Sequence, residues 1–550
     1  MKSLFLKSIL FFILLSSLAF SIEGRNHCIR KQAISSDLTP PPASERYPGR
    51  NSYLAFKDSL ITTNFVIFFT KTGVRAIQNA NIDANVNGYP DKIDSIGILL
   101  EDAWDFYMNK SGMPKPPLFA AQKYPVYIDT MSYYGFVQPT NLLGDNPNTS
   151  TKETKSIYSY MSILNQYDIV NGINIGGFAQ AMKPTITHEF FHVIQLGVNS
   201  EYTPWFLESS ATAMENIRHP ENTDNMQFLG AYTQQPDLPI EFSELSSEFN
   251  NLGINSPSHE YSVWPFFRGL YDHYSGMSIL KEITDQYGLL PSGSSQVITQ
   301  MLDTILKKYN SSFQSELQNF FVSQLRMSTT RKPWNYEFAD QFKALSNYSS
   351  LKLKIERNLA YTKDTLKHNS QIDGNSTLWG KSADFFSVTG NQVFSFHVSP
   401  QNKDTLGIIL VQERSDSLSI RFWDVGTDLI RNIDNPLNWT STHLIVWNKG
   451  YSAKNSAYNL NLEPKSSVGI IQNQSHVFNI SVQSKQVQVK NLSSETMQLW
   501  SLYKNDGTRV VGGIIVPNEG QAEIDLRSVS SGVYILQIQG STTKFMLTED

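Results

Sequence analysis

Residues 188–192 read His-Glu-Phe-Phe-His, and this short stretch predicts more about the fold than any other part of the chain. Side chains four residues apart lie on one face of a helix, about one turn from each other. His188 and His192 can therefore present imidazole nitrogens to one metal ion, while Glu189 lies beside that ion without binding it. Apolar neighbours predict that the rest of the helix packs on a core, and Pro184 suits its first turn.

A second helix is expected just downstream, where residues 205–208 (Trp-Phe-Leu-Glu) bring in another carboxylate. Thr203 suits its N-cap and Pro204 its first position. Two His and one Glu leave Zn²⁺ a fourth position for water, whose pKa falls toward neutrality. We predict that Glu208 completes a zinc site, that Glu189 is the general base, and that the reaction is amide hydrolysis.

The pattern His-Glu-x-x-His also occurs in ordinary amphipathic helices, where both His are surface or core residues. The chain has only 10 His, and the Trp-x-x-Glu at 205–208 favours the metal site. Thr212, four residues after Glu208, is then placed to hydrogen-bond a zinc ligand.

Together the two segments resemble the gluzincin metallopeptidases, the broad group of thermolysin and aminopeptidase N. The resemblance is specific in His188-Glu189-x-x-His192 and in Trp205-x-x-Glu208-x-x-Ala211, and more diffuse over residues 60 to 330. It implies zinc ligands His188, His192 and Glu208 with Glu189 as base. The stretch between His192 and Glu208 is shorter than in the best-known members.

The resemblance also implies a side chain from a later helix that stabilises the oxyanion. Tyr261 is the candidate, and His259 is the thermolysin-like alternative; an aromatic core helix is the non-catalytic interpretation of the same segment. Met214-Glu215-Asn216 is similar to an exopeptidase motif, but it lies downstream of the His pair. We expect Glu215 on the helix surface, which favours an endopeptidase.

A calcium loop is predicted at residues 83–94, with Gly88 at the sharp turn. The alternative is a surface turn rich in Asn, Asp and Gly. The candidate oxygen ligands fall at the first, third, fifth, ninth and twelfth places of the loop: Asp83, Asn85, Asn87, Asp91 and Asp94.

Residues 1–21 predict a secretory signal peptide, because Lys2 and Lys7 precede an apolar run at 9–15 and a small-x-small ending follows at 19–21. No later stretch reaches the length that a bilayer needs, so we expect an exported protein that is not an integral membrane protein. Cys28 is the single cysteine, which excludes an intramolecular disulfide. The formal net charge of −5 comes without a basic cluster and gives no reason to expect nucleic acid as a partner.

The changes in residue pattern along the chain predict a multidomain protein. A polar leader, linker or short prosegment at 22–55 precedes an α+β, zincin-like metallopeptidase domain at 56–345, in which residues 157–170 are expected to hold an edge strand for the substrate backbone. Alternating runs then predict two all-β, sandwich-like modules, at 346–465 and 475–550. The tryptophans of the first module suit a sandwich core better than a binding surface: Trp423, Trp439 and Trp447.

Residues 475–550 resemble the C-terminal sorting domain of type IX secretion cargo. The resemblance rests on Trp500-Ser501-Leu502-Tyr503, on the Asn-Asp-Gly turn at 505–507, and on the strand Gly532-Val533-Tyr534. It implies export through the periplasm, and then release or attachment at the cell surface.

The sequence thus predicts a secreted zinc metallopeptidase whose partners are a protein or peptide substrate and the type IX machinery. A non-catalytic surface adhesin on a latent metallopeptidase fold is the rival interpretation. A third keeps the hydrolase but directs it at a bond other than a peptide bond.

Overall fold

The chain folds into two compact units, Met1–Lys465 and Ser466–Asp550. The predicted signal peptide (1–21) and leader (22–55), with Cys28, lie outside the described residues. The computed structural model describes residues 56–547 except 119–122, 132, 168, 171–172, 175–177, 202, 247–248, 250–253, 329–335, 337, 346–350, 361–363, 369–377, 390–393, 401–404, 415–416, 434–438, 451–454, 465–478, 484, 491–497, 505–507, 519–520 and 539–540.

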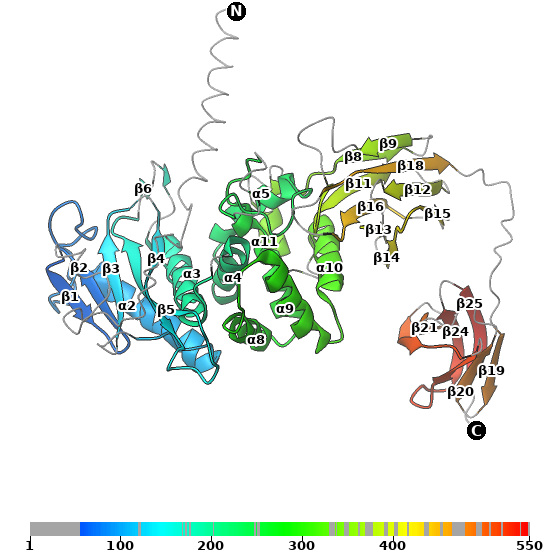
Figure 1. Ribbon diagram of the computed structural model, residues 1–550, viewed down its shortest axis with the longest axis horizontal. Helices are drawn as coiled ribbons and strands as arrows, with labels where there is room; N and C mark the ends of the chain where they lie inside the picture. Colours follow the sequence, from blue (N-terminus) through cyan, green and yellow to red (C-terminus); the bar gives the residue numbers. More distant parts are fainter. Residues whose placement is uncertain are drawn as a thin grey trace, which may run out of the picture. The chain divides into compact units, whose positions relative to one another are not determined.

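The first unit begins with a five-stranded sheet in the order β1-β2-β3-β5-β4 (Figure 1). Its three central strands run parallel, and β1 and β4 are antiparallel to their neighbours. The central strands are buried on both faces: β2 is a continuous apolar run, and β5 also buries three serines. The bounds are β1 Asp58–Ile61, β2 Phe65–Phe69, β3 Tyr124–Asp129, β4 Gly135–Gly144 and β5 Ser156–Leu164, and a separate ribbon pairs β6 Ile169–Val170 with β7 Ile173–Asn174.

This strand order corrects the prediction of an edge strand at 157–170. Strand β5 occupies that stretch and lies inside the sheet, hydrogen-bonded to β3 on one side and β4 on the other. The edge belongs to β4, an antiparallel strand that returns beside β5. Strand order depends on pairing between distant segments, which the local apolar pattern of residues 157–164 does not contain.

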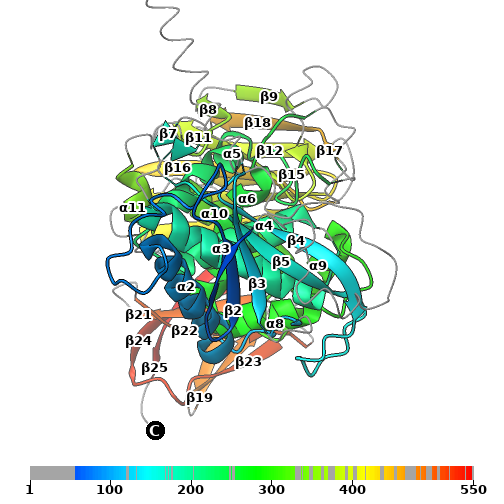
Figure 2. The ribbon, with the colours of Figure 1, turned by 90° about the vertical axis from the view of Figure 1, so that its left-hand side faces the viewer.

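Helix α3, Phe178–Val198, lies on strands β5 and β4 and carries the His pair (Figure 2). It begins six residues before Pro184, so the prediction of Pro184 in the first turn is wrong. Pro184 has no N–H to donate to the carbonyl of Gln180. That carbonyl instead accepts a hydrogen bond of 2.8 Å from the side-chain amide of Asn222, which lets the helix continue through the proline.

Helix α4, Pro204–Arg218, packs on α3 and brings in Glu208. Thr203 is its N-cap residue, but the Thr203 hydroxyl bonds the carbonyl of Gly293 and makes no capping bond. None of the helices that the structure describes is long and apolar enough to cross a membrane. The other bounds are α2 Asp91–Trp104, the π-helix η3 Asp105–Lys110, the 3₁₀ helix η4 Asp224–Phe228, α5 Leu229–Gln234, α6 His259–Ser262, α7 Trp264–His273, α8 Met277–Tyr287, α9 Ser295–Lys307, α10 Phe313–Arg326 and α11 Ala339–Lys343.

A β-sandwich follows within the same unit. Its sheets have the orders β14-β13-β16-β11-β8 and β15-β12-β18-β9. The bounds are β8 Arg357–Ala360, β9 Asp364–His368, β10 Leu378–Trp379, β11 Ala383–Thr389, β12 Phe394–Pro400, β13 Leu406–Arg414, β14 Ser417–Asp424, β15 Leu429–Ile433, β16 Ser441–Asn448, β17 Asn455–Ser456 and β18 Tyr458–Pro464.

The tryptophans of this sandwich differ in burial. Trp447 is buried and its ring lies 6.0 Å from that of Phe321 in α10, so one hydrophobic cluster joins the sandwich to the helices. Gly407 must be glycine, because a Cβ there would lie 2.2 Å from Trp447 Nε1. Trp423 and Trp439 are half-buried beside arginines.

The second unit, described by itself, consists of two small antiparallel sheets, β19-β20-β23 and β22-β21-β24-β25, around one apolar cluster. The Gly-Val-Tyr segment begins β24, and the hydroxyl of Tyr534 donates to the carbonyl of Ser530 at 2.7 Å. The bounds are β19 Asn479–Gln483, β20 Gln486–Lys490, β21 Gln498–Lys504, β22 Arg509–Ile515, β23 Gln521–Asp525, β24 Gly532–Ile538 and β25 Ser541–Leu547.

Candidate metal centre

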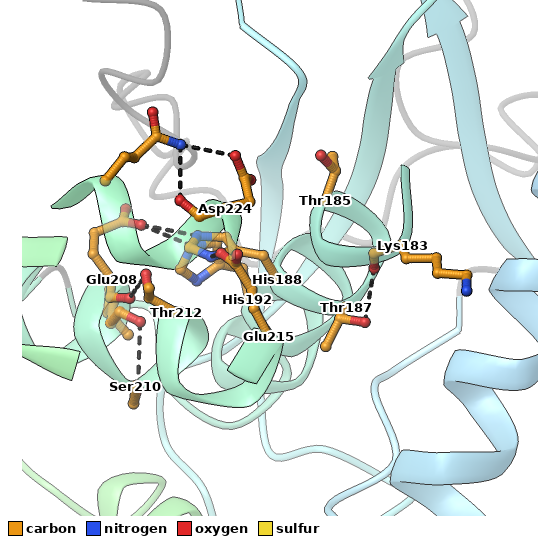
Figure 3. Close-up of polar contacts among 12 residues, drawn as sticks. Lys183, Thr185, Thr187, His188, His192, Glu208, Ser210, Thr212, Glu215 and Asp224 are labelled. Atoms are coloured by element: carbon orange, nitrogen blue, oxygen red, sulfur yellow. Dashed lines mark hydrogen bonds and ion pairs between the residues drawn. The ribbon is translucent and has the colours of Figure 1, made fainter. Parts of the chain in front are cut away.

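Helices α3 and α4 bring two histidines and one glutamate to a single point (Figure 3). Nε2 of His188 and Nε2 of His192 each lie 3.1 Å from the same oxygen, Oε2 of Glu208. One ligand atom from each residue lies within 4.8 Å of the other two, and all three side chains are buried. Within the described part of the chain, no other group of three or more His, Cys, Asp and Glu side chains could hold a metal ion. The structure therefore brings together the three residues predicted as ligands.

The second nitrogen of each histidine has its own acceptor. His188 Nδ1 lies 2.7 Å from Glu215 Oε1, and because an ionised carboxylate can only accept, Nδ1 donates. His192 Nδ1 lies 2.7 Å from Gln195 Oε1, and Gln195 Nε2 donates to Ser210 Oγ at 2.9 Å, which fixes the orientation of the amide. Both contacts place the proton on Nδ1 and leave Nε2 with the lone pair that a metal requires.

One of the two predictions about the surroundings of the ligands is wrong. Glu215 was expected on the surface of its helix, but it is 2% exposed and holds His188. It lies seven residues, two helical turns, after Glu208 and so faces α3 as Glu208 does. Thr212 was expected to hydrogen-bond a zinc ligand, and its hydroxyl does bond Glu208, through the backbone carbonyl of that residue at 2.8 Å. Gln195 was missed, although its position three residues after His192 is a helical signal for contact.

The donor set fits a divalent ion. Burial raises the pKa of Glu208, but His192 and His188, when they are protonated, lower it to about 2 through their charge and hydrogen bonds. Its other oxygen, Oε1, is buried without a hydrogen-bond partner among the described residues. Two neutral imidazoles and one carboxylate are a common ligand set for Zn²⁺ in catalytic sites.

Glu189 lies beside this set and against the edge strand of the sheet. It is 2% exposed, and a Cβ added to Gly135 at the start of β4 would lie 2.9 Å from Glu189 Cγ and 3.0 Å from Thr185 Cγ2. Glycine at this position lets the strand approach the carboxylate closely.

Of the two candidates for an oxyanion donor, Tyr261 is near the histidines. Its ring stacks 6.0 Å from that of His188 and 4.9 Å from that of Phe228, and it is 1% exposed. The ring of His259 contacts Tyr232 and Phe242 instead, and its Nε2 lies 3.1 Å from the carbonyl of Pro239. Burial lowers the pKa of His259 to about 4, so this ring is neutral at pH 7.

Sequence patterns did not single out two buried polar side chains in the segments η4 and α6, which pack on α4. Asn225 is 1% exposed, and neither its amide nitrogen nor its oxygen has a partner among the described residues. Burial raises the pKa of Glu260 to about 8, and the charge of Glu208 contributes to that rise. In most proteins a buried polar side chain has a hydrogen-bond partner in the protein or in ordered water.

The predicted calcium loop is a compact turn before α2. Side-chain amides of Asn85 and Asn87 both donate to Asp94 Oδ2 at 2.9 Å, while Asp83 accepts from the backbone of Gly88 at 2.9 Å and Asp91 from that of Ala84 at 2.8 Å. Calcium binding at this loop stays a prediction.

No protein-family model and no curated protein matches the chain. Among solved structures it matches the tandem CBM22-1–CBM22-2 domain of Paenibacillus barcinonensis Xyn10C over 34% of this chain and 78% of that one, with 8% identity and a TM-score of 0.14. The BSP domain of a biofilm associated protein matches over 34% and 51%, with 6% identity and a TM-score of 0.12. Lactobacillus rhamnosus β-glucuronidase matches over 30% and 35%, with 12% identity and a TM-score of 0.10. TM-scores this low carry no argument about fold or function.

Proposed function

We propose that this chain is a secreted, zinc-dependent metallopeptidase with a zincin-like catalytic domain. The observation that carries the proposal is the buried group of His188, His192 and Glu208, with both Nε2 atoms directed at one carboxylate oxygen. A carboxylate beside the three ligands, Glu189 on the same helix, is what a hydrolytic site needs in addition to the ligands themselves. The resemblance of the two segments to gluzincins points to the same reaction.

Each nearby side chain has a role in peptide hydrolysis. Zinc held by the three ligands would act as a Lewis acid and lower the pKa of water. Glu189 would accept a proton from the attacking water and pass it to the leaving nitrogen. Tyr261 would donate a hydrogen bond to the oxyanion, and Glu215 and Gln195 would keep the two imidazoles in the ligand tautomer.

The edge strand β4 gives the substrate a place to bind. An extended peptide can add to an exposed edge through main-chain hydrogen bonds, and the start of β4 lies against Glu189. We therefore propose that residues 135–144, and not residues 157–170, form the edge strand that pairs with the substrate backbone. We propose an endopeptidase, because the segment similar to an exopeptidase motif lies downstream of the His pair and its Glu215 holds His188.

The second unit is proposed to be the sorting domain of type IX secretion, on the strength of its sequence resemblance. Export would place the enzyme outside the cell or on its surface. Deleting residues 466–550 should then retain the protein in the periplasm of a host that has this secretion system.

The test of the activity pairs metal content with turnover of casein or a quenched peptide, for the wild type and for Glu189→Gln. We expect about one zinc per chain in both proteins and turnover only in the wild type, since the substitution removes the proton acceptor and spares the ligands. Zinc in both without turnover of any peptide would support the surface adhesin or a hydrolase of another bond. Turnover in Glu189→Gln equal to the wild type would refute the assigned base.

A further inference from the structure

Tyr261, the side chain proposed above as oxyanion donor, packs apart from the main hydrophobic core. Among the described buried residues, it shares a small apolar cluster with Phe228 alone. The two rings stack 4.9 Å apart at 26°, and the Tyr261 ring is also nearly parallel to that of His188, at 6.0 Å and 21°. The place of the Tyr261 ring beside His188 therefore depends on where Phe228 lies.

Phe228 is the last residue of the 3₁₀ helix η4, which packs on α6, the helix of Tyr261. The side-chain amide of Gln227 donates to the backbone carbonyl and to Oδ1 of Asp224, at 2.9 and 2.8 Å, and so connects the two ends of η4. A helix of five residues is not stable by itself. Contacts with the rest of the fold must therefore fix its position.

Asn222 supplies one such contact with both ends of its side chain. Its Oδ1 accepts from the N–H of Asp224, the first residue of η4, at 2.8 Å. Its Nδ2 donates to the carbonyl of Gln180 in α3, also at 2.8 Å. That carbonyl has no helical donor, because Pro184 lacks an N–H. Asn222 is 7% exposed, and its one side chain links η4 to the helix that carries two of the proposed zinc ligands.

The chain before Asn222 is attached to the same helix at a second point. The N–H of Asn222 donates to the carbonyl of His219 at 2.9 Å, and His219 Nε2 lies 3.1 Å from Thr187 Oγ1, next to His188. This contact fixes the start of the segment 219–228, and Asn222 fixes its continuation into η4.

We propose that Asn222 and Phe228 are positioning residues for Tyr261. Asn222 ties η4 to α3, and Phe228 at the end of η4 holds the Tyr261 ring beside His188. Both residues would act on catalysis through Tyr261 and not on the substrate itself. These roles rest on the peptidase activity proposed above. A donor that is displaced by about 1 Å from the developing charge loses much of its effect on the rate.

The kinetic test is a double-mutant cycle of Asn222→Ala with Tyr261→Phe, in the full zinc-loaded chain with a quenched peptide. We expect Asn222→Ala and Phe228→Leu each to lower kcat about 10- to 100-fold. KM should stay within about twofold, because the oxyanion exists only in the transition state. In the Tyr261→Phe background, which has no hydroxyl to position, Asn222→Ala should change kcat less than about twofold. Thr223→Ala is the matched control, since Thr223 is exposed in the same turn and makes no capping bond.

Pro184→Ala separates positioning from a contribution to folding alone. Alanine at this place has an N–H for the carbonyl of Gln180, so adding Pro184→Ala to Asn222→Ala should restore the Tm. It should not restore kcat, because η4 would still lack its link to α3.

Two kinetic results would overturn the proposal. One is recovery of kcat when Pro184→Ala is added, since Asn222 would then only complete α3. The other is an effect of Asn222→Ala that is as large in Tyr261→Phe as in the wild type. If the wild type cleaves no peptide, the proposed activity fails, and amide hydrogen exchange of residues 258–263 still tests the positioning. Faster exchange in Asn222→Ala and Phe228→Leu than in Thr223→Ala would support it, and equal exchange would overturn it.

Discussion

Replacing Glu215 by Gln should weaken metal binding at a site that Glu215 itself does not ligate. In the structure, Glu215 Oε1 accepts from His188 Nδ1 at 2.7 Å, and both side chains are at most 3% exposed. Gln has nearly the same shape and keeps an acceptor, so the packing of α4 on α3 should survive. The substitution removes only the charge that makes this hydrogen bond strong and raises the basicity of Nε2.

The size of the effect follows from the hydrogen bond. A bond to a charged group contributes about 1.5 to 3 kcal/mol, against about 0.5 to 1.5 kcal/mol for a neutral one. The difference, about 1 to 2 kcal/mol, corresponds to a roughly 5- to 30-fold rise in the Kd for zinc, because 1.4 kcal/mol is a factor of ten. Substitution of such outer residues in other zinc proteins typically costs about 10- to 100-fold.

The assay is competition for zinc with a chromophoric chelator, with circular dichroism as the check on folding. Glu221→Gln is the matched control, since Glu221 lies just beyond α4, is 63% exposed, and has its nearest positive charge 3.9 Å away at Lys183. The reasoning is refuted if Glu215→Gln binds zinc within twofold of the wild type, or if Glu221→Gln loses as much affinity.

Three further predictions address the walls of the site and the fold. Gly135→Ala should lower turnover at least about tenfold with a modest loss of stability, because the new Cβ would displace Glu189; unchanged kcat/KM would contradict this placement. Asn225→Leu should keep or raise the Tm, since a buried amide without a partner destabilises a protein by about 1 to 3 kcal/mol. The same substitution should lower turnover, and full activity would show that Asn225 has no role in catalysis. Burial raises the pKa of Asp384 to about 7, so its contribution to stability is complete below pH 4 and is lost as the pH rises through 7. Asp384→Asn should therefore flatten the fall of the urea midpoint between pH 4 and 7, and a slope equal to that of the wild type in this range would refute the assignment.

Local patterns predicted the elements that depend on local chemistry. The apolar residues at 277–287, 295–308 and 311–326 recur with helical spacing, which predicts three helices, and α8, α9 and α10 begin and end within two residues of these segments. The geometry of His188, His192 and Glu208 could be anticipated because four-residue spacing fixes a shared helix face. The apolar run Phe65–Phe69 likewise predicts strand β2, and the helical spacing of apolar residues between Ile96 and Tyr107 predicts helix α2.

What the sequence did not predict depends on partners far along the chain. The local pattern places Glu215 on the surface of its helix, but α3 packs on that side of α4 and buries it. Which strand forms the edge of the sheet depends on the pairing of β4 with β5, which the local pattern does not contain. A proline such as Pro184 is typical of the first turn of a helix. The hydrogen bond that lets α3 continue through it comes from Asn222, 38 positions later, and local sequence does not show that contact. In each of these cases the local prediction was reasonable, and contacts with a distant part of the chain produced a different structure.

The most direct test of the central claim is anomalous diffraction at the zinc absorption edge from crystals of the purified chain. The account predicts one strong peak about 2.0 to 2.2 Å from Nε2 of His188, Nε2 of His192 and a carboxylate oxygen of Glu208. A zinc-loaded protein with no peak between these three residues, or with its peak at another group of side chains, would contradict it.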